Sequence, residues 1–219
     1  MAPESINGKA IFSNLDQTRK YLDLIIYILG RLSSPDEDKE VCSDILSSLK
    51  KMLQFEAIGL RIKSGADYPY FVTQGFPEHF IEAERFLCST DPNGMFITDS
   101  DGIPQLECMC GTVISGRTDP SRSFFTPYGS FWSNSTTKLL AETSEEQRQG
   151  RTRNRCNSEG YESVALIPLR STDDTLGLLQ LNDRNKDMFT PMMISVIEGV
   201  ANIIGIGLNQ RGHNNRVFG

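Results

Sequence analysis

The sequence predicts an α+β domain in which an antiparallel sheet has its helices gathered on one face. Three observations predict it: apolar stripes at helical spacing near both ends of the chain, short alternating strand patterns that include one hairpin, and the order of these patterns. The order is helix, helix, strand, strand, helix, irregular segment, hairpin, helix. We therefore expect a single domain over residues 14–210, with a flexible lead-in over 1–13 and a flexible tail over 211–219.

Two helices are expected first. Asn14 can cap the first helix, and apolar residues recur at helical spacing as far as Leu32, in a stripe broad enough to pack on two sides. The segment Ser33-Ser34-Pro35-Asp36 ends this helix, and Pro35 suits the first turn of the next. The second helix has its own apolar face, made of Val41, Ile45, Leu49, Met52 and Leu53.

Strands follow the two helices. Residues 57–62 alternate in polarity, and residues 70–74 form a second short strand after a turn. A third helix is expected from Pro77 to about Leu87. Residues 88–160 are weakly patterned, but an irregular segment of that length is improbable in a compact domain, so it must contain short helices or strands.

The last part of the chain is regular again. Residues 162–169 and 175–182 predict a hairpin, and Thr190-Pro191 begins a closing helix whose apolar side continues to Leu208. The first and last helices are long and apolar enough to form a bundle. In a homodimer that bundle would be four-helical.

Composition excludes several classes of function. The 219 residues have a net charge of -6, whereas phosphate binding needs a basic face, so no nucleic-acid partner is expected. The start lacks the apolar core of a signal peptide, and the strongest apolar run, Tyr21–Leu32, is short for a membrane span and contains Asp23. An odd number of cysteines, 5, without a secretory context predicts a cytoplasmic protein with free or metal-bound thiols.

The cysteines are the most informative feature for function. Cys88, Cys108, Cys110 and Cys156 lie in the irregular segment, and Cys108 and Cys110 form a Cys-x-Cys pair. Cysteine prefers burial as a small hydrophobe, so its clustering on irregular chain favours a chemical role. Cys42, beside the apolar face of the second helix, is expected to be a packing residue.

The chain resembles a GAF domain, the small-ligand sensor module of many signalling proteins. Gly160–Leu169 resembles the strand that runs to a proline near its end, Thr175–Asn182 the following G-x-L-x-L strand, and Phe189-Thr190 the start of the closing helix. The first helix and residues 55–60 fit as well, so the resemblance covers roughly residues 15 to 210. It implies a ligand on the sheet face opposite the terminal helices, walled by the irregular segment.

More narrowly, three segments resemble the inserts of GAF modules in bacterial and archaeal PAS-GAF sensor histidine kinases: Leu106–Gly111, Gly129–Thr136 and Arg153–Asn157. Some sensors of that kind hold haem through a cysteine. The resemblance implies a homodimeric sensor in a two-component system, with the histidine kinase either downstream or a separate protein. No phosphoacceptor-histidine helix or ATP-binding glycine box follows residue 210, so the chain itself is expected not to be an enzyme.

Three uses of the thiols remain open. Cys88, Cys108, Cys110 and Cys156 could share one metal centre, either structural zinc or an iron–sulfur cluster. Haem is the second, with a thiolate as axial ligand or with His79, the only histidine outside the tail. Trp132 could then line a flat pocket and Asn134 could bond the ligand. The third is redox switching of the thiols, since Arg153 and Arg155 flank Cys156 and cations lower a thiol pKa.

Our expectation is a sensory or regulatory domain that detects redox state, a gas or a small ligand through a cysteine-held metal centre. Two other classes stay open. A few GAF-like enzymes reduce free methionine sulfoxide with pocket cysteines, and thiols on this segment could attack a sulfoxide and resolve as a disulfide. If the thiols are empty, the chain could be a dimerisation module.

Overall fold

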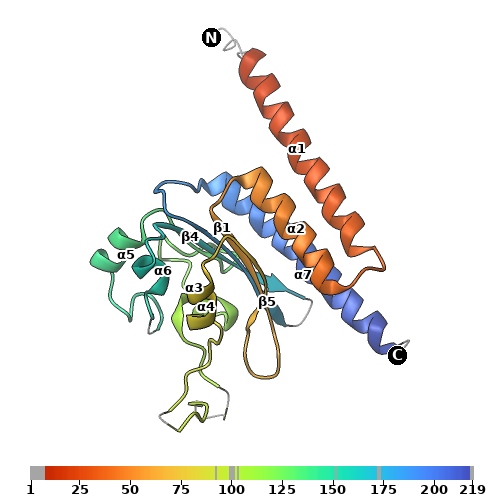
Figure 1. Ribbon diagram of the computed structural model, residues 1–219. Coiled ribbons are helices and arrows are strands. Elements are labelled where there is room, and N and C mark those ends of the chain that lie inside the picture. Colours follow the sequence, from red (N-terminus) through yellow and green to blue (C-terminus); the bar gives the residue numbers. More distant parts are fainter. Residues whose placement is uncertain are drawn as a thin grey trace.

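The computed structural model describes residues 8–91, 93–98, 102, 104–150, 152–171 and 174–217. Its centre is a five-stranded antiparallel sheet with the strand order β2-β1-β5-β4-β3. Long helices cover one face of this sheet, and short helices from the middle of the chain cover the other (Figure 1). The α+β architecture that the sequence predicts is confirmed.

The helical face is formed by α1 (Gly8–Leu32), α2 (Asp38–Leu53) and α7 (Pro191–Val217). The apolar stripe of α2 is buried, as its spacing predicts, except for Met52, which is partly buried. Among the residues of α1 whose burial is described, Leu24, Ile28 and Leu32 in its C-terminal part contribute to this core. The N-terminal part of α1 projects beyond the sheet (Figure 1).

The sheet has β1 (Ala57–Ile62) between β2 (Tyr70–Gln74) and β5 (Thr175–Asp183), while β4 (Ser163–Arg170) pairs with β5 and with the edge strand β3 (Phe131–Ser133). Successive residues of a strand point to opposite faces. Ala165, Ile167 and Leu169 of β4 accordingly join the core under the long helices, whereas Val164 and Leu166 join a second core on the other face. The predicted hairpin is therefore confirmed.

The second core is covered by α3 (Glu78–Ala83), α4 (Cys108–Ile114), α5 (Thr136–Glu142) and α6 (Arg155–Ser158). The irregular segment thus contains short helices and one strand, as its length predicts. The ring of Phe80, a residue of α3, packs against the rings of Phe76 and Tyr161, which also contact each other. This face of the sheet is where the cysteine-bearing elements α4 and α6 lie.

The third helix is shorter than predicted and ends at Ala83 instead of near Leu87. The reason is the carboxylate of Asp67, which accepts hydrogen bonds from the backbone amides of Leu87 (2.9 Å) and Cys88 (3.0 Å). These amides would bond within the helix if it continued. Their capture by Asp67 turns the chain out of the helix towards α4.

Both terminal helices are longer than the sequence suggests. Helix α1 begins at Gly8, within the segment predicted as a flexible lead-in, and α7 continues to Val217, through most of the segment predicted as a flexible tail. Arg211 explains the extension of α7, because its guanidinium bonds the carbonyl oxygens of Leu32 (3.0 Å) and Ser34 (2.6 Å) after the end of α1. Residues 1–7, 218 and 219 lie outside the described part of the chain.

The expectation that Tyr21–Leu32 is the strongest candidate for a membrane span is wrong. The stretch Pro191–Gly212, and not Tyr21–Leu32, is long and apolar enough to cross a membrane by length and composition. In the fold its residues Ile194, Ile197, Val200 and Ile204 are buried against the sheet. At Gly205 an added Cβ would lie 2.4 Å from the carbonyl oxygen of Arg170, so this helix rests directly on the end of β4. One side of α7 is therefore part of the core on this face of the sheet.

Candidate functional site

Three of the predicted cysteines meet on the sheet face opposite the long helices. Cys108 and Cys110 belong to α4 and Cys156 to α6, and the side-chain amide of Gln180 on β5 lies between Cys110 and Cys156. The Cys110 thiol lies 4.0 Å from Gln180 Oε1, and Gln180 Nε2 lies 3.7 Å from the sulfur of Cys156. We call Cys108, Cys110 and Cys156 the thiol cluster.

The orientation of Gln180 is fixed by its neighbours. Its Oε1 accepts a hydrogen bond from the Tyr70 hydroxyl (2.9 Å), and its Nε2 donates to Asn182 Oδ1 (3.0 Å). Gln180 is buried, and buried amides are ordinarily fully bonded in this way. The amide therefore presents its NH₂ group to Cys156 and its oxygen to Cys110.

The backbone of Cys108 is unusual. Its φ of 64° lies in the left-handed region, which non-glycine residues seldom adopt. This residue turns the chain from the extended Glu107 into α4, and α4 is pressed closely against the preceding chain, since a Cβ on Gly111 would lie 2.6 Å from the carbonyl carbon of Leu106. Strained residues of this kind concentrate at functional sites.

The three thiols have different acidities. A hydrogen bond from the Cys110 thiol stabilises the thiolate of Cys108 and lowers the Cys108 pKa to about 7, against the opposing effect of burial. The same hydrogen bond, together with burial, raises the pKa of Cys110. Burial raises the pKa of Cys156 to about 12. Cys108 is therefore the thiol of this cluster that ionises near neutral pH, and the thiolate is the nucleophilic form.

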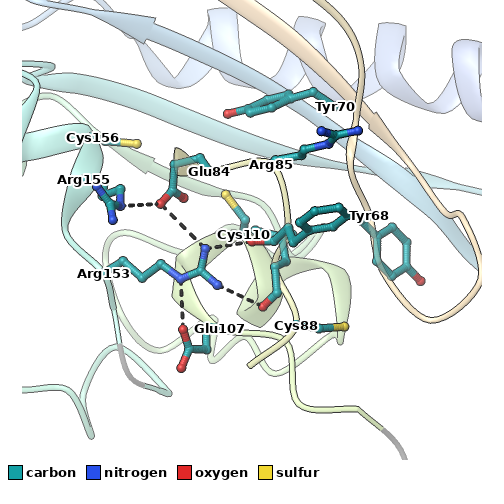
Figure 2. A network of polar contacts seen from close by, with 12 residues as sticks. Tyr68, Tyr70, Glu84, Arg85, Cys88, Glu107, Cys110, Arg153, Arg155 and Cys156 are labelled. Atoms are coloured by element: carbon teal, nitrogen blue, oxygen red, sulfur yellow. Dashed lines mark hydrogen bonds and ion pairs between the residues drawn. The ribbon is translucent and has the colours of Figure 1, made fainter. Parts of the chain in front are cut away.

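A network of charged residues holds α6 against α4 and the end of α3 (Figure 2). Arg153 Nε bonds Glu107 Oε2 at 2.9 Å, and its NH1 bonds the carbonyl oxygen of Phe86 at 2.7 Å. The buried Glu84 carboxylate lies 3.2 Å from Arg155 Nε and 3.7 Å from Arg153 NH1. Burial raises the Glu84 pKa, and the arginines oppose that rise. These contacts lie beside the thiol cluster, where the chain leaves α3 and enters α4 and α6.

A second buried cation lies beneath the network. Arg61 of β1 is fully buried, and its guanidinium lies 3.6 Å from the centre of the Tyr70 ring. It donates hydrogen bonds to the carbonyl oxygens of Tyr68 (2.9 Å) and Glu84 (2.5 Å). Its charge acts against the burial that raises the pKa values of Cys110 and Cys156.

The thiol cluster borders a small cavity of about 50 Å³. Its walls include all three thiols, apolar residues of α5 and β4, and the polar residues Arg148 and Thr152. A much larger open cavity of about 920 Å³ lies elsewhere, between Lys63, Arg117 and Arg170, and none of the cysteines lines it. We place the candidate site at the small cavity because that is where the titratable thiols meet.

Cys88, the fourth thiol of the predicted centre, does not line the cavity beside the thiol cluster. Its sulfur lies 3.4 Å from the carbonyl oxygen of Ala66, and its amide is held by Asp67. Burial raises its pKa to about 12. Among the described residues, which include all the cysteines, no group of three or more His, Cys, Asp or Glu side chains is arranged to hold a metal ion.

Haem does not fit the site either. Cofactor pockets typically have volumes of about 300–1,000 Å³, far above the cavity beside the thiols. His79 lies on the surface, where its side chain is 71% exposed and Nε2 lies 2.8 Å from Glu159. Trp132 packs in the core on the helical face of the sheet, away from the thiols.

Asn134 has a structural contact in place of the predicted ligand contact. Its amide bonds the backbone N–H (2.9 Å) and carbonyl oxygen (2.8 Å) of Phe189, just before α7. Arg153 and Arg155 also differ from expectation, since they pair with Glu84 and Glu107 while the pKa of Cys156 is raised. No role was predicted for Gln180 from the sequence. Gln180 and Asn182 are two residues apart in a strand that is otherwise mostly apolar, so the sequence places both polar side chains on one buried face.

The sequence matches no protein-family model, and no curated protein shows significant similarity to it. Solved structures nevertheless share its fold. The GAF domain of a phosphoenolpyruvate-protein phosphotransferase from Coxiella burnetii is 14% identical with a TM-score of 0.62, covering 90% of this chain and 98% of that chain. The fRMsr of Staphylococcus aureus, in complex with its substrate, is 15% identical with a TM-score of 0.55, covering 84% and 93%.

A domain of a putative two-component sensor histidine kinase protein from Sinorhizobium meliloti is similar at 14% identity and a TM-score of 0.53, covering 84% of this chain and 99% of that chain. These likenesses, together with the sheet order and the helices on one face, define the chain as a GAF-fold domain. The GAF resemblance seen in the sequence is confirmed at the level of the fold.

Proposed function

We propose that this chain is a sensory or regulatory GAF domain that responds to oxidants through its thiol cluster. The observation that carries the proposal is the position of Cys108, Cys110 and Cys156 around one cavity, where the Cys110 thiol lowers the Cys108 pKa to about 7. Low-pKa thiols beside a second, resolving thiol are the usual arrangement of redox-sensing cysteines.

The chemistry is a two-step oxidation. The Cys108 thiolate attacks one oxygen of hydrogen peroxide, the O–O bond breaks, and the products are Cys108 sulfenic acid and hydroxide, which takes up a proton to become water. A second thiol of the cluster, Cys110 or Cys156, then attacks the Cys108 sulfur and expels its hydroxyl group as a second water. Overall, two thiols and one peroxide give one disulfide and two waters.

A disulfide from Cys108 to Cys156 would link α4 to α6, and a disulfide from Cys108 to Cys110 would close a small ring within α4. Either bond engages one of the two sulfurs that contact Gln180, whose strand β5 packs on its other face against α7. A change in the redox state of the cluster is thereby transmitted through β5 to the terminal helix α7. The output partner in this proposal is a histidine kinase or another transmitter in the cytoplasm, supported by the histidine-kinase domain among the structural neighbours.

We further propose that the receiving unit is a homodimer joined through the terminal helices. Leu22, Ile26 and Leu29 of α1 are exposed and recur at i, i+4 and i+7, which is the spacing of a helix–helix seam. Ile26 is 66% exposed. A second copy that packs the same stripe would cover these residues in a four-helix bundle.

An enzyme of the fRMsr kind is the competing function, because such a protein shares the fold and thiols can attack a sulfoxide. Against it, the cavity beside the thiols is far smaller than the space that an amino-acid-sized substrate needs. The test is to treat the reduced protein with hydrogen peroxide and with free methionine sulfoxide and to map the cysteines by mass spectrometry. We expect an intramolecular disulfide at Cys108 with peroxide. Turnover of methionine sulfoxide with a thiol reductant would favour the enzyme, and a chain whose Cys108 stays reduced with peroxide would refute the sensor.

A further inference from the structure

A large open cavity lies at the end of the sheet where β1 and β4 end and β5 begins. Its volume is about 920 Å³, and its walls come from the turn between β1 and β2, the C-terminal end of α4 and both sides of the turn between β4 and β5. Small-molecule sites typically have volumes of about 300–1,000 Å³. None of the cysteines lines this cavity, so a ligand here would be separate from the thiol cluster.

The charged residues that line this cavity are three cations and one carboxylate, namely Lys63, Arg117, Arg170 and Asp174. Lys63 Nζ lies 2.9 Å from Asp174 Oδ2, so these two charges compensate each other. Neither Arg117 nor Arg170 forms an ion pair with an Asp or Glu among the residues that the structure describes. The wall therefore carries two guanidinium groups whose charge no described carboxylate balances, and such a wall favours an anion.

The guanidinium of Arg170 is held by packing. It lies 4.7 Å from the centre of the Tyr128 ring, and its Nη2 occupies the space beside Gly129, where an added Cβ would lie only 2.6 Å from it. The same Cβ would lie 3.3 Å from the hydroxyl oxygen of Thr118, so Arg170 reaches the segment that begins with Arg117. Its planar fork of donors makes no hydrogen bond to another described residue, and this fork matches the geometry of an oxyanion.

The guanidinium of Arg117 is anchored to the cavity wall at one nitrogen. Its Nη2 donates to the carbonyl oxygen of Leu106 at 2.9 Å, and both residues line the cavity. Its other nitrogens have no hydrogen bond within the described part of the chain. Beside the cations, Tyr68, Leu106 and Ile114 supply apolar wall. A ligand with an oxyanion and an apolar part would bond the arginines and cover this apolar surface.

We propose that this cavity binds a small organic oxyanion, either a phosphate ester or a carboxylate, through Arg117 and Arg170. The site also adjoins the closing helix, because a Cβ on Gly205 of α7 would lie 2.4 Å from the carbonyl oxygen of Arg170. The chain thus has a ligand site beyond its thiols, and this site does not depend on the redox chemistry of the thiol cluster.

The first test is a titration of the reduced protein, followed through the NMR signals of its backbone amides. Phenyl phosphate and benzoate are the probes, and we expect saturable shifts at residues 115–117 and 174–175. The probe that binds more tightly identifies phosphate or carboxylate as the ligand group. Benzyl alcohol has no oxyanion and should cause no shift. Inorganic phosphate and acetate should each bind about tenfold more weakly than the matching aromatic probe, because they cannot cover the apolar wall.

The second test repeats the titration with variants. Arg117→Met and Arg170→Met should each weaken binding about fivefold or more, since each removes charge-assisted hydrogen bonds. Arg170→Lys keeps the charge without the planar fork and should bind with an intermediate affinity. Arg85→Met, at a side chain that is 57% exposed and outside the cavity, should bind like the wild type. Arg117 is exposed, so its variant decides the test even if Arg170→Met fails to fold.

Three results would overturn the oxyanion site. They are the lack of saturable shifts with both aromatic probes, binding of benzyl alcohol as tight as that of the anions, and wild-type affinity in either folded arginine-to-methionine variant. Equal binding of the small and the aromatic anions would remove the organic part of the ligand and overturn the proposal as stated. None of these results concerns the oxidation of Cys108, so the thiol sensor stands or fails separately.

Discussion

The Cys110 thiol lowers the pKa of Cys108, the residue two positions before it on the first turn of α4, to about 7. This arrangement depends on the left-handed backbone of Cys108, since residues two apart in a regular helix do not face each other. The two residues have different roles in the redox site: Cys108 ionises, and Cys110 stays protonated and stabilises the Cys108 thiolate.

The reaction of Cys108 with peroxide should follow its ionisation. Because its pKa is lowered to about 7, the rate should rise as pH increases through 7 and level off above it. Cys110→Ala removes the stabilising hydrogen bond, so the Cys108 pKa should rise towards the usual value of about 8.5 and the profile should move to higher pH. Stopped-flow oxidation over a pH series measures both curves. Superimposable profiles for the two proteins would contradict the proposed contact.

Gln180→Leu should destabilise the domain by about 2 kcal/mol. The substitution leaves the buried Tyr70 hydroxyl and the Asn182 side chain without a shared partner, and unpaired buried groups cost about 1–3 kcal/mol each. Urea unfolding gives the free energy of unfolding. Gln74→Leu is the matched control, since Gln74 bonds Ser43 and Ser47 at the surface, and its effect should stay within about 0.5 kcal/mol.

Arg153→Met should destabilise the protein by about 2 kcal/mol, because it leaves the buried Glu84 carboxylate with less compensation and frees Glu107. Adding Glu84→Gln should recover part of the loss, since the remaining buried side chain is then neutral. Arg85→Met is the control, as the Arg85 side chain is 57% exposed and its ion pair with Glu82 is long, at 3.9 Å. Additive losses in the Glu84–Arg153 double-mutant cycle would mean that the two residues do not interact energetically.

The thiols should carry no stoichiometric metal. Cys88 does not line the cavity beside the other three thiols, and among the described residues no group of three or more Cys, His, Asp or Glu side chains is arranged to hold a metal ion. Metal analysis and an absorption spectrum of protein purified without oxygen decide the matter. One zinc per chain, iron with sulfide, or a Soret band would each restore the metal centre that the sequence suggests.

Glutamates on the exposed stripe of α1 should prevent dimerisation. Ile26→Glu with Leu29→Glu places two charges in the proposed helix–helix seam, where burial of unpaired charge is costly. Light scattering should show a dimer for the wild-type chain and a monomer for this variant. Lys51→Glu, at an exposed position of α2, changes the surface charge outside the stripe and should leave the dimer intact. A wild-type monomer at micromolar concentration would refute the bundle.

The sequence by itself determined the architecture. Period-two and helical spacings reveal which faces are buried, so the hairpin of β4 and β5, the apolar stripe of α2 and the closing helix could all be predicted. Helix ends were less certain, because they depend on distant partners. Arg211 extends α7 by bonding carbonyls after α1, and Asp67 ends α3 by capturing two amides.

Only the tertiary structure decided which thiols form the site. A count and a spacing cannot show that Asp67 holds Cys88 apart, or that Gln180 on a strand late in the chain joins Cys110 to Cys156. The physical reason is that acidity, burial and hydrogen bonding depend on neighbours in space. Segments far apart in sequence supply those neighbours once the sheet has formed.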